Sequence, residues 1–158
     1  MLKTIGALGL GFAALLVTAG NGFTEEMALV PGSASIKWAP GPASLPKGVQ
    51  LAVLAGDPGQ PGPFALRAKI PPNTVIAPHW HATAENLTVL SGPLFHEMGD
   101  KLDKSRGEQM QAGGYVYLPA NMNHSVWTTT SEAIVQVTGT GPFGVNYANP
   151  ADDPSKSQ

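Results

Sequence analysis

The chain has 158 residues, of which 13% are charged, with a formal net charge of −2 and no cysteine. This length fits one domain that can bury a core. No run of like charges appears, which excludes the basic surfaces typical of proteins that bind nucleic acid or anionic membranes. The absence of cysteine excludes a disulfide framework and a thiolate ligand, so a metal site would have to use nitrogen and oxygen donors.

Residues 1–22 have the pattern of a secretory signal peptide. Lys3 provides a positive start, residues 5–17 are apolar, and Val17-Thr18-Ala19 offers small residues for cleavage. The apolar run is shorter than the roughly twenty residues that a membrane helix needs, and an uncleaved interfacial anchor is the alternative. No twin arginine precedes the run, which indicates export of an unfolded chain. We therefore expect a periplasmic or secreted protein that has no membrane segment after cleavage.

The rest of the chain has the pattern of short strands separated by turns rich in glycine and proline. Strands are expected at residues 49–55, 64–70, 74–81, 84–90, 94–98, 115–118, 124–129, 132–138 and 143–147. The polar residues 100–111 are expected to form a loop or a single turn. The pattern predicts one all-β domain over residues 23–150, a sandwich or barrel, followed by a polar C-terminal tail at residues 151–158 that is frayed.

Four side chains form a candidate metal site. His79 and His81 are separated by one residue, so they point to the same face of an extended strand. Glu85 follows after a short corner, and His124 has to arrive by tertiary folding. Three imidazoles and one carboxylate suit a divalent transition metal, and a six-coordinate ion would keep two positions for a small-molecule ligand or substrate. The alternative is that these are ordinary polar residues on a strand surface.

The spacing of these residues resembles the two conserved motifs of the cupin superfamily. Residues 73–92 are similar to the first motif, G-x5-H-x-H-x3-E-x6-G, and residues 113–128 are similar to the second, G-x5-P-x-G-x2-H-x3-N, through Gly113, Pro119 and His124. The resemblance implies a cupin-type antiparallel β-barrel, also described as a jelly roll or double-stranded β-helix, with the metal in its mouth. It also implies a homodimer that pairs through the segment of residues 33–38.

Three positions depart from the cupin motifs. Asn73 and Asn121 replace glycines, and asparagine is among the few residues that enter left-handed turn conformations at low cost. Thr128 replaces an asparagine and keeps a hydrogen-bonding group. None of the three departures is at a predicted ligand position.

Two further residues are candidates for lining the cavity. His96 is the fourth histidine of the chain, and a partly exposed strand histidine is the expectation for a histidine without evident partners. Gln136 alternates with Val135 and Val137, so it either reaches the cavity or points outward. The metal can be manganese, iron, zinc, nickel or copper, because the affinity order outside the cytoplasm and the ligand geometry favour different ions.

The leading functional hypothesis is an exported mononuclear metalloenzyme of the dioxygenase or oxidoreductase type that acts on a small oxygen-rich molecule. The alternative hypothesis is a binding or sensing protein that holds a metal, or a metal with a small ligand, without turnover. The motifs contain no evident general base, which favours the alternative, and a purely structural barrel is a third interpretation.

Overall fold

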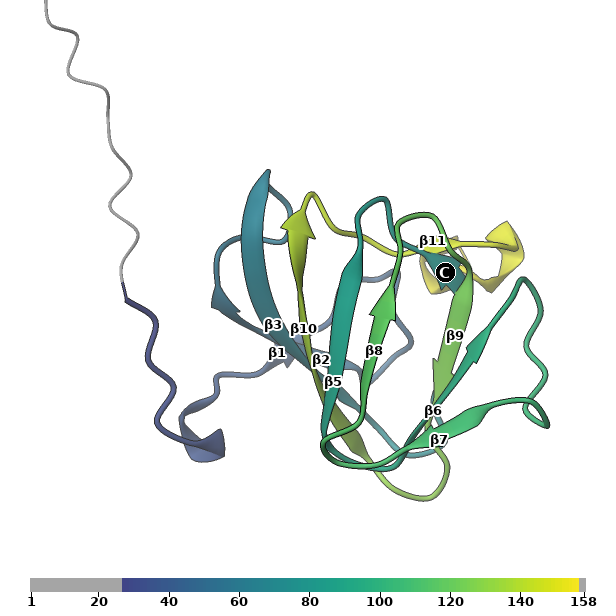
Figure 1. Ribbon diagram of the computed structural model, residues 1–158, viewed down its shortest axis with the longest axis horizontal. Helices are drawn as coiled ribbons and strands as arrows, with labels where there is room; N and C mark the ends of the chain where they lie inside the picture. Colours follow the sequence, from purple (N-terminus) through teal and green to yellow (C-terminus); the bar gives the residue numbers. More distant parts are fainter. Residues whose placement is uncertain (1–26, 157–158) are drawn as a thin grey trace, which may run out of the picture.

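The structure is a computed structural model that describes residues 27–156. The predicted signal peptide, residues 1–22, lies outside the described residues. Two antiparallel β-sheets form the domain (Figure 1). The first sheet contains β1 (Ala39–Pro40), β2 (Gln50–Ala55), β3 (Gly62–Ile70), β5 (Glu85–Ser91), β8 (Tyr115–Leu118) and β10 (Ala133–Gly141). The second sheet contains β4 (Val75–Trp80), β6 (Leu94–Met98), β7 (Glu108–Met110), β9 (His124–Trp127) and β11 (Asn146–Tyr147).

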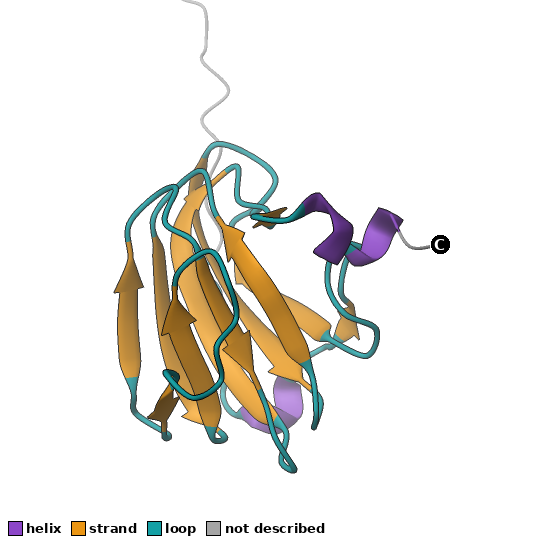
Figure 2. Cartoon of the chain, turned by 90° about the vertical axis from the view of Figure 1, so that its right-hand side faces the viewer, coloured by secondary structure: helices purple, strands orange, loops and turns teal. Residues whose placement is uncertain are grey.

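The strand order joins distant parts of the chain. It is β1-β2-β3-β10-β5-β8 in the first sheet and β11-β4-β9-β6-β7 in the second. The two sheets face each other, and short 3-10 turns near the C-terminus lie outside them (Figure 2). The prediction of an all-β fold of the antiparallel jelly-roll type is confirmed. No helix within residues 27–156 is long and apolar enough to cross a membrane.

Strand alternation explains the core between the sheets. In β3, Phe64, Leu66 and Ile70 are buried, whereas the residues between them are half-buried. Registers place apolar partners side by side, as in the row formed by Leu66, Val137 and Leu87 across β3, β10 and β5. Each fully buried side chain of this kind contributes roughly 1.5–3 kcal/mol to the free energy of folding. The core therefore clamps the two sheets around the space where the predicted site residues meet.

The three departures from the cupin motifs behave as their chemistry predicts. Asn73 and Asn121 adopt left-handed backbone conformations, with φ of 55° and 63°. Thr128 is buried, and its Oγ1 accepts a hydrogen bond of 3.0 Å from the backbone N–H of Thr74 and donates to the carbonyl oxygen of Pro71. These contacts hold the turn before β4 against the end of β9.

Some expected elements differ from the structure. Residues 100–111, expected as a loop, contain β7, whose residue Glu108 pairs with His96 on β6. The predicted strand at 143–147 is paired only at β11, and the expected frayed tail instead forms two 3-10 turns, Pro150–Asp152 and Pro154–Lys156. Ser33–Ser35 is a 3-10 turn and not a strand, so the homodimer stays a prediction without a pairing strand at that segment.

Candidate metal centre

Strand pairing brings the predicted histidines together. β4 and β9 are neighbours, and His79 lies directly opposite His124 in their register. His81 follows the end of β4, and Glu85 opens β5 in the other sheet. All four side chains are buried, with exposed fractions of 6% or less. The ring centroids of the three imidazoles are 4.2 to 5.3 Å apart.

A β-bulge on β4 turns His79 toward this cluster. Ile76 pairs with Val126 and His79 pairs with His124, so three residue steps on β4 match two on β9. Strict alternation from Ile76, which lines the central cavity, would point His79 away from it. The extra residue restores the inward direction, which is how bulges re-aim side chains beside functional sites.

Backbone carbonyls fix the orientation of each imidazole. Nδ1 of His79 lies 2.8 Å from the carbonyl oxygen of Ala77, and Nδ1 of His81 lies 2.7 Å from that of Gly144. Nδ1 of His124 is 3.2 Å from the carbonyl oxygen of Met122. Because a carbonyl oxygen only accepts, each Nδ1 carries the proton and each Nε2 of the neutral ring keeps a free lone pair. This arrangement typically orients the histidine ligands of a metal.

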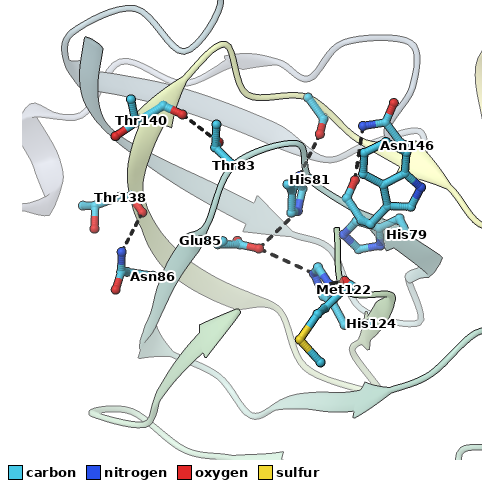
Figure 3. Close-up of polar contacts among 12 residues, drawn as sticks. His79, His81, Thr83, Glu85, Asn86, Met122, His124, Thr138, Thr140 and Asn146 are labelled. Atoms are coloured by element: carbon cyan, nitrogen blue, oxygen red, sulfur yellow. Dashed lines mark hydrogen bonds and ion pairs between the residues drawn. The ribbon is translucent and has the colours of Figure 1, made fainter. Parts of the chain in front are cut away.

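The carboxylate of Glu85 meets two of these Nε2 atoms. Its Oε2 is 3.1 Å from Nε2 of His81 and 3.5 Å from Nε2 of His124 (Figure 3). Two donors bound at 2.0–2.2 Å to one cation, at the angles of octahedral or tetrahedral sites, are separated by about 2.9–3.5 Å. Oε2 of Glu85 is buried without a hydrogen-bond donor. The donor set and its spacing therefore fit a shared divalent cation.

The surroundings keep His79 neutral and Glu85 charged. Burial, together with the charges of His124 and His81, lowers the pKa of His79 to about 3. Burial disfavours the charged form of Glu85, but the adjoining imidazoles of His124 and His81 outweigh it and lower the pKa of Glu85 to about 2. Both protonation states are those that a metal ligand requires.

His96 and Gln136 do not line the cavity. His96 is buried, at 8% exposure, and its ring stacks at 5.8 Å against that of His124, so the expectation of a partly exposed histidine is wrong. Burial and the charge of His124 lower the pKa of His96 to about 4. Gln136 lies on the outer face of β10, where its Oε1 accepts a hydrogen bond of 3.2 Å from Nε of Arg67. It is the neighbouring valines that point inward.

A cavity of about 230 Å³ opens beside the four side chains. His79, His81, Glu85 and His124 all line it. Phe143 stacks on the His81 ring at 4.1 Å and also faces the cavity. A molecule inside this space would directly contact these four side chains. Sequence reasoning did not find the cavity walls, because they come from segments spread over more than a hundred residues.

Residues 26–144 match the family described as the ChrR cupin-like domain. No curated protein matches the chain. The structure is similar to the polyketide cyclase RemF from Streptomyces resistomycificus, at 19% identity and a TM-score of 0.64 over 82% of this chain and 92% of that one. It is also similar to the DMSP lyase DddQ from Ruegeria pomeroyi, at 18% identity and a TM-score of 0.55 over 69% and 58% of the two chains. An RmlC-like cupin from Shewanella frigidimarina matches at 13% identity and a TM-score of 0.53 over 69% and 86%. At these identities, the similarities establish a shared fold.

Proposed function

The chain belongs to the ChrR cupin-like family, and we propose that it is a mononuclear metal-dependent enzyme that acts on a small molecule. The cupin resemblance of the two sequence motifs agrees with this family and with the two-sheet fold. Two of the similar structures are described as a cyclase and a lyase, which supports a catalytic use of the fold, although a fold alone does not determine an activity.

One observation carries the proposal. Three imidazoles are anchored through Nδ1, which leaves each Nε2 available to bind a cation, and a buried carboxylate oxygen without a donor lies at ligand–ligand distance from two of these Nε2 atoms. A buried charge without a partner is strongly unfavourable, and a divalent cation bound by all four groups removes that penalty. His79, His81, Glu85 and His124 are the proposed ligands.

A bound divalent metal would supply a Lewis acid with exchangeable positions beside the cavity. The residues of this chain supply the rest. The carbonyl oxygens of Ala77, Gly144 and Met122 hold the rings in place, and Phe143 packs against His81 on the cavity side. The hydrophobic walls exclude water, which strengthens electrostatic interactions with a bound molecule.

The identity of the metal and the reaction are more specific proposals. Nitrogen and oxygen donors suit manganese, iron, zinc, nickel or copper. Three histidines and one carboxylate leave two positions of an octahedral ion free, and this supports chemistry of the dioxygenase or oxidoreductase type.

A non-catalytic metal or ligand carrier is the second candidate. Within the described residues, the ionisable side chains that line the cavity are the four proposed ligands themselves. An enzyme of this design would therefore depend on the metal and on groups of the substrate for proton transfer. Turnover of a bound molecule separates the two functions.

The deciding experiment is elemental analysis of untagged protein purified from its native compartment, followed by loading of the chelated protein with Co²⁺. We expect close to one metal per chain and a Co²⁺ absorption spectrum that changes when small ligands enter the free positions. Oxygen uptake with candidate substrates then tests the oxidoreductase proposal. Protein that takes up no divalent metal would refute the proposed function, and a spectrum that no small ligand alters would indicate a closed structural site.

Export is a further part of the proposal, supported by the sequence pattern of residues 1–22. We expect the mature protein in the periplasm or the medium, with its N-terminus close to residue 23. Cell fractionation and mass measurement of the intact chain test this. Full-length protein in the cytoplasm would contradict it. A homodimer is proposed on the cupin resemblance alone, and sedimentation tests it.

A further inference from the structure

We infer that the cavity takes a largely apolar small molecule, about the size of a substituted benzene ring, with a single oxygen-containing group that binds the metal. This inference rests on the proposed function and names the substrate class of the same site. It replaces the sequence-based expectation of a small oxygen-rich substrate.

The walls of the cavity are rows of aliphatic side chains. Beyond Glu85 on β5, the next inward residue is Leu87, which lies beside Val137 on β10 and, across that strand, Leu66 on β3. A second row, farther from the proposed ligands, contains Val135, Ala68 and Leu51. The opposite sheet adds Ile76 and Val126. All of these side chains can bury hydrocarbon, and none can form a hydrogen bond.

Few polar side chains line this space. Among the residues that line it, the polar side chains are the four proposed ligands and Ser44. Within residues 27–156, no lysine or arginine lines it. A sugar or a dicarboxylate would therefore bury hydroxyl or carboxylate groups without partners, and each such group costs roughly 1 kcal/mol or more. A ligand with one metal-coordinating group and a hydrocarbon body would leave no polar group of its own without a partner.

The volume limits the size of the hydrocarbon body. An apolar protein cavity of about 150 Å³ accommodates benzene, and the cavity here is about 230 Å³. The additional space suits a ring with a short branched substituent, or an aliphatic body of the same size. Val53 lines the cavity and is 54% exposed, which places an opening to solvent at this residue.

A matched pair of variants on one strand tests the inference. Ala68 lines the cavity and pairs with Val135, which in turn pairs with Val89 on β5. Val89 is four residues after Glu85, so this row lies roughly 13 Å from Glu85 along the strand. Ala68→Leu fills this far part of the cavity and leaves the ligands in place. Ala65 is three residues before Ala68 on the same strand, so it faces the other side of the sheet and does not line the cavity, and Ala65→Leu makes the same change outside it. Leu51→Phe fills the same row from the paired strand if Ala68→Leu does not fold.

In the first arm, Co²⁺-loaded protein is titrated with acetohydroxamate and with 4-isopropylbenzohydroxamate, which share one metal-binding group. We expect the wild type and Ala65→Leu to bind the aromatic compound at least about tenfold more tightly, because the ring and its substituent enter the apolar rows. Ala68→Leu should lose this preference while its affinity for acetohydroxamate is unchanged. Equal affinities in the wild type, or an equal loss for both compounds in Ala68→Leu, would overturn the inference.

The second arm uses chelated, metal-free protein and toluene. Toluene should raise the melting temperature of the wild type and of Ala65→Leu, and should leave that of Ala68→Leu unchanged. If the protein takes up no metal, the proposed function fails, and this arm still decides the nature of the cavity. No response to toluene in the wild type would show that the cavity does not take an apolar molecule.

Discussion

Glu85 carries the most direct test of the proposed ligand set. The three histidines lie close enough together to hold a cation by themselves, and the four-ligand proposal depends on Glu85. Glu85→Gln keeps the size of the side chain but removes its charge. Even residues that only orient a metal ligand contribute 10- to 100-fold to metal affinity. We therefore expect this substitution of a direct ligand to weaken binding by about 100-fold or more.

The expected size of the effect follows from linkage. At a free metal concentration of 100 times the wild-type dissociation constant, binding stabilises the folded protein by about 2.7 kcal/mol. The described domain has 130 residues, from 27 to 156, and an unfolding entropy of about 2.1 cal/mol/K per residue converts this gain into roughly 10 °C. In Glu85→Gln, the same metal concentration would equal the dissociation constant, and the gain would be about 0.4 kcal/mol, or less than 2 °C.

The assay is differential scanning calorimetry of each protein with chelator and with metal, so that only the metal-induced shift is compared. Glu132→Gln is the control, since it makes the same change at an exposed carboxylate just before Ala133, which lies six residues along β10 from Gly139, the residue paired with Glu85. It should keep the full shift. A shift in Glu85→Gln as large as that in the wild type would refute the reasoning, and would assign the cation to the three histidines alone.

Three further predictions concern the metal-free protein. The pKa of His79 is about 3 in the folded state and 6.5 in the unfolded state, so the unfolded chain binds more protons between these pH values. The free energy of unfolding, measured with urea, should therefore fall by about 2–3 kcal/mol between pH 7 and pH 4.5. An equal fall in His79→Gln would contradict this prediction. Tyr147→Phe removes the O–H that donates to the carbonyl oxygen of Ser44 at 2.7 Å; unfolding free energy should fall by about 1 kcal/mol, with faster hydrogen exchange around Ser44, and unchanged exchange would argue against a role for this bond. Gly107→Ala places a methyl group against the indole ring of Trp127. The free energy of unfolding, measured by thermal unfolding, should fall by about 1–3 kcal/mol. An unchanged melting temperature would mean that the loop moves aside.

The sequence predicted the features that depend on local chemistry. Alternating apolar residues located β2 to β6 and β8 to β10 within a few positions, because a strand buried on one face must alternate. Asn73 and Asn121 were expected to occupy left-handed turns, since their short polar side chains tolerate positive φ, and both do. The spacing of His79 and His81 identified them as candidate ligands without any tertiary information.

The features that depend on neighbouring strands could not be predicted in the same way. His96 was expected to be partly exposed because it had no evident partners in the sequence, and residues 100–111 were expected to form a loop or a single turn. β7 instead pairs along β6, and the strand that contains His96 becomes internal. Similarly, the bulge that turns His79 inward exists only in the register of β4 against β9, and a register is not visible in either strand alone.

The same distinction separates the metal centre from its proposed substrate. The proposed ligands belong to two short motifs, so they can be identified from the sequence. Their oxygen and nitrogen donors suggested an oxygen-rich substrate. The walls that select the substrate are single side chains from many elements, such as Leu51, Leu66, Ile76 and Val137. Each of these is indistinguishable in sequence from a core residue. Only their arrangement around an open volume supports the proposal that they bind a hydrocarbon. In this fold, the metal-binding chemistry is therefore encoded locally, whereas substrate choice is a property of the assembled sheets.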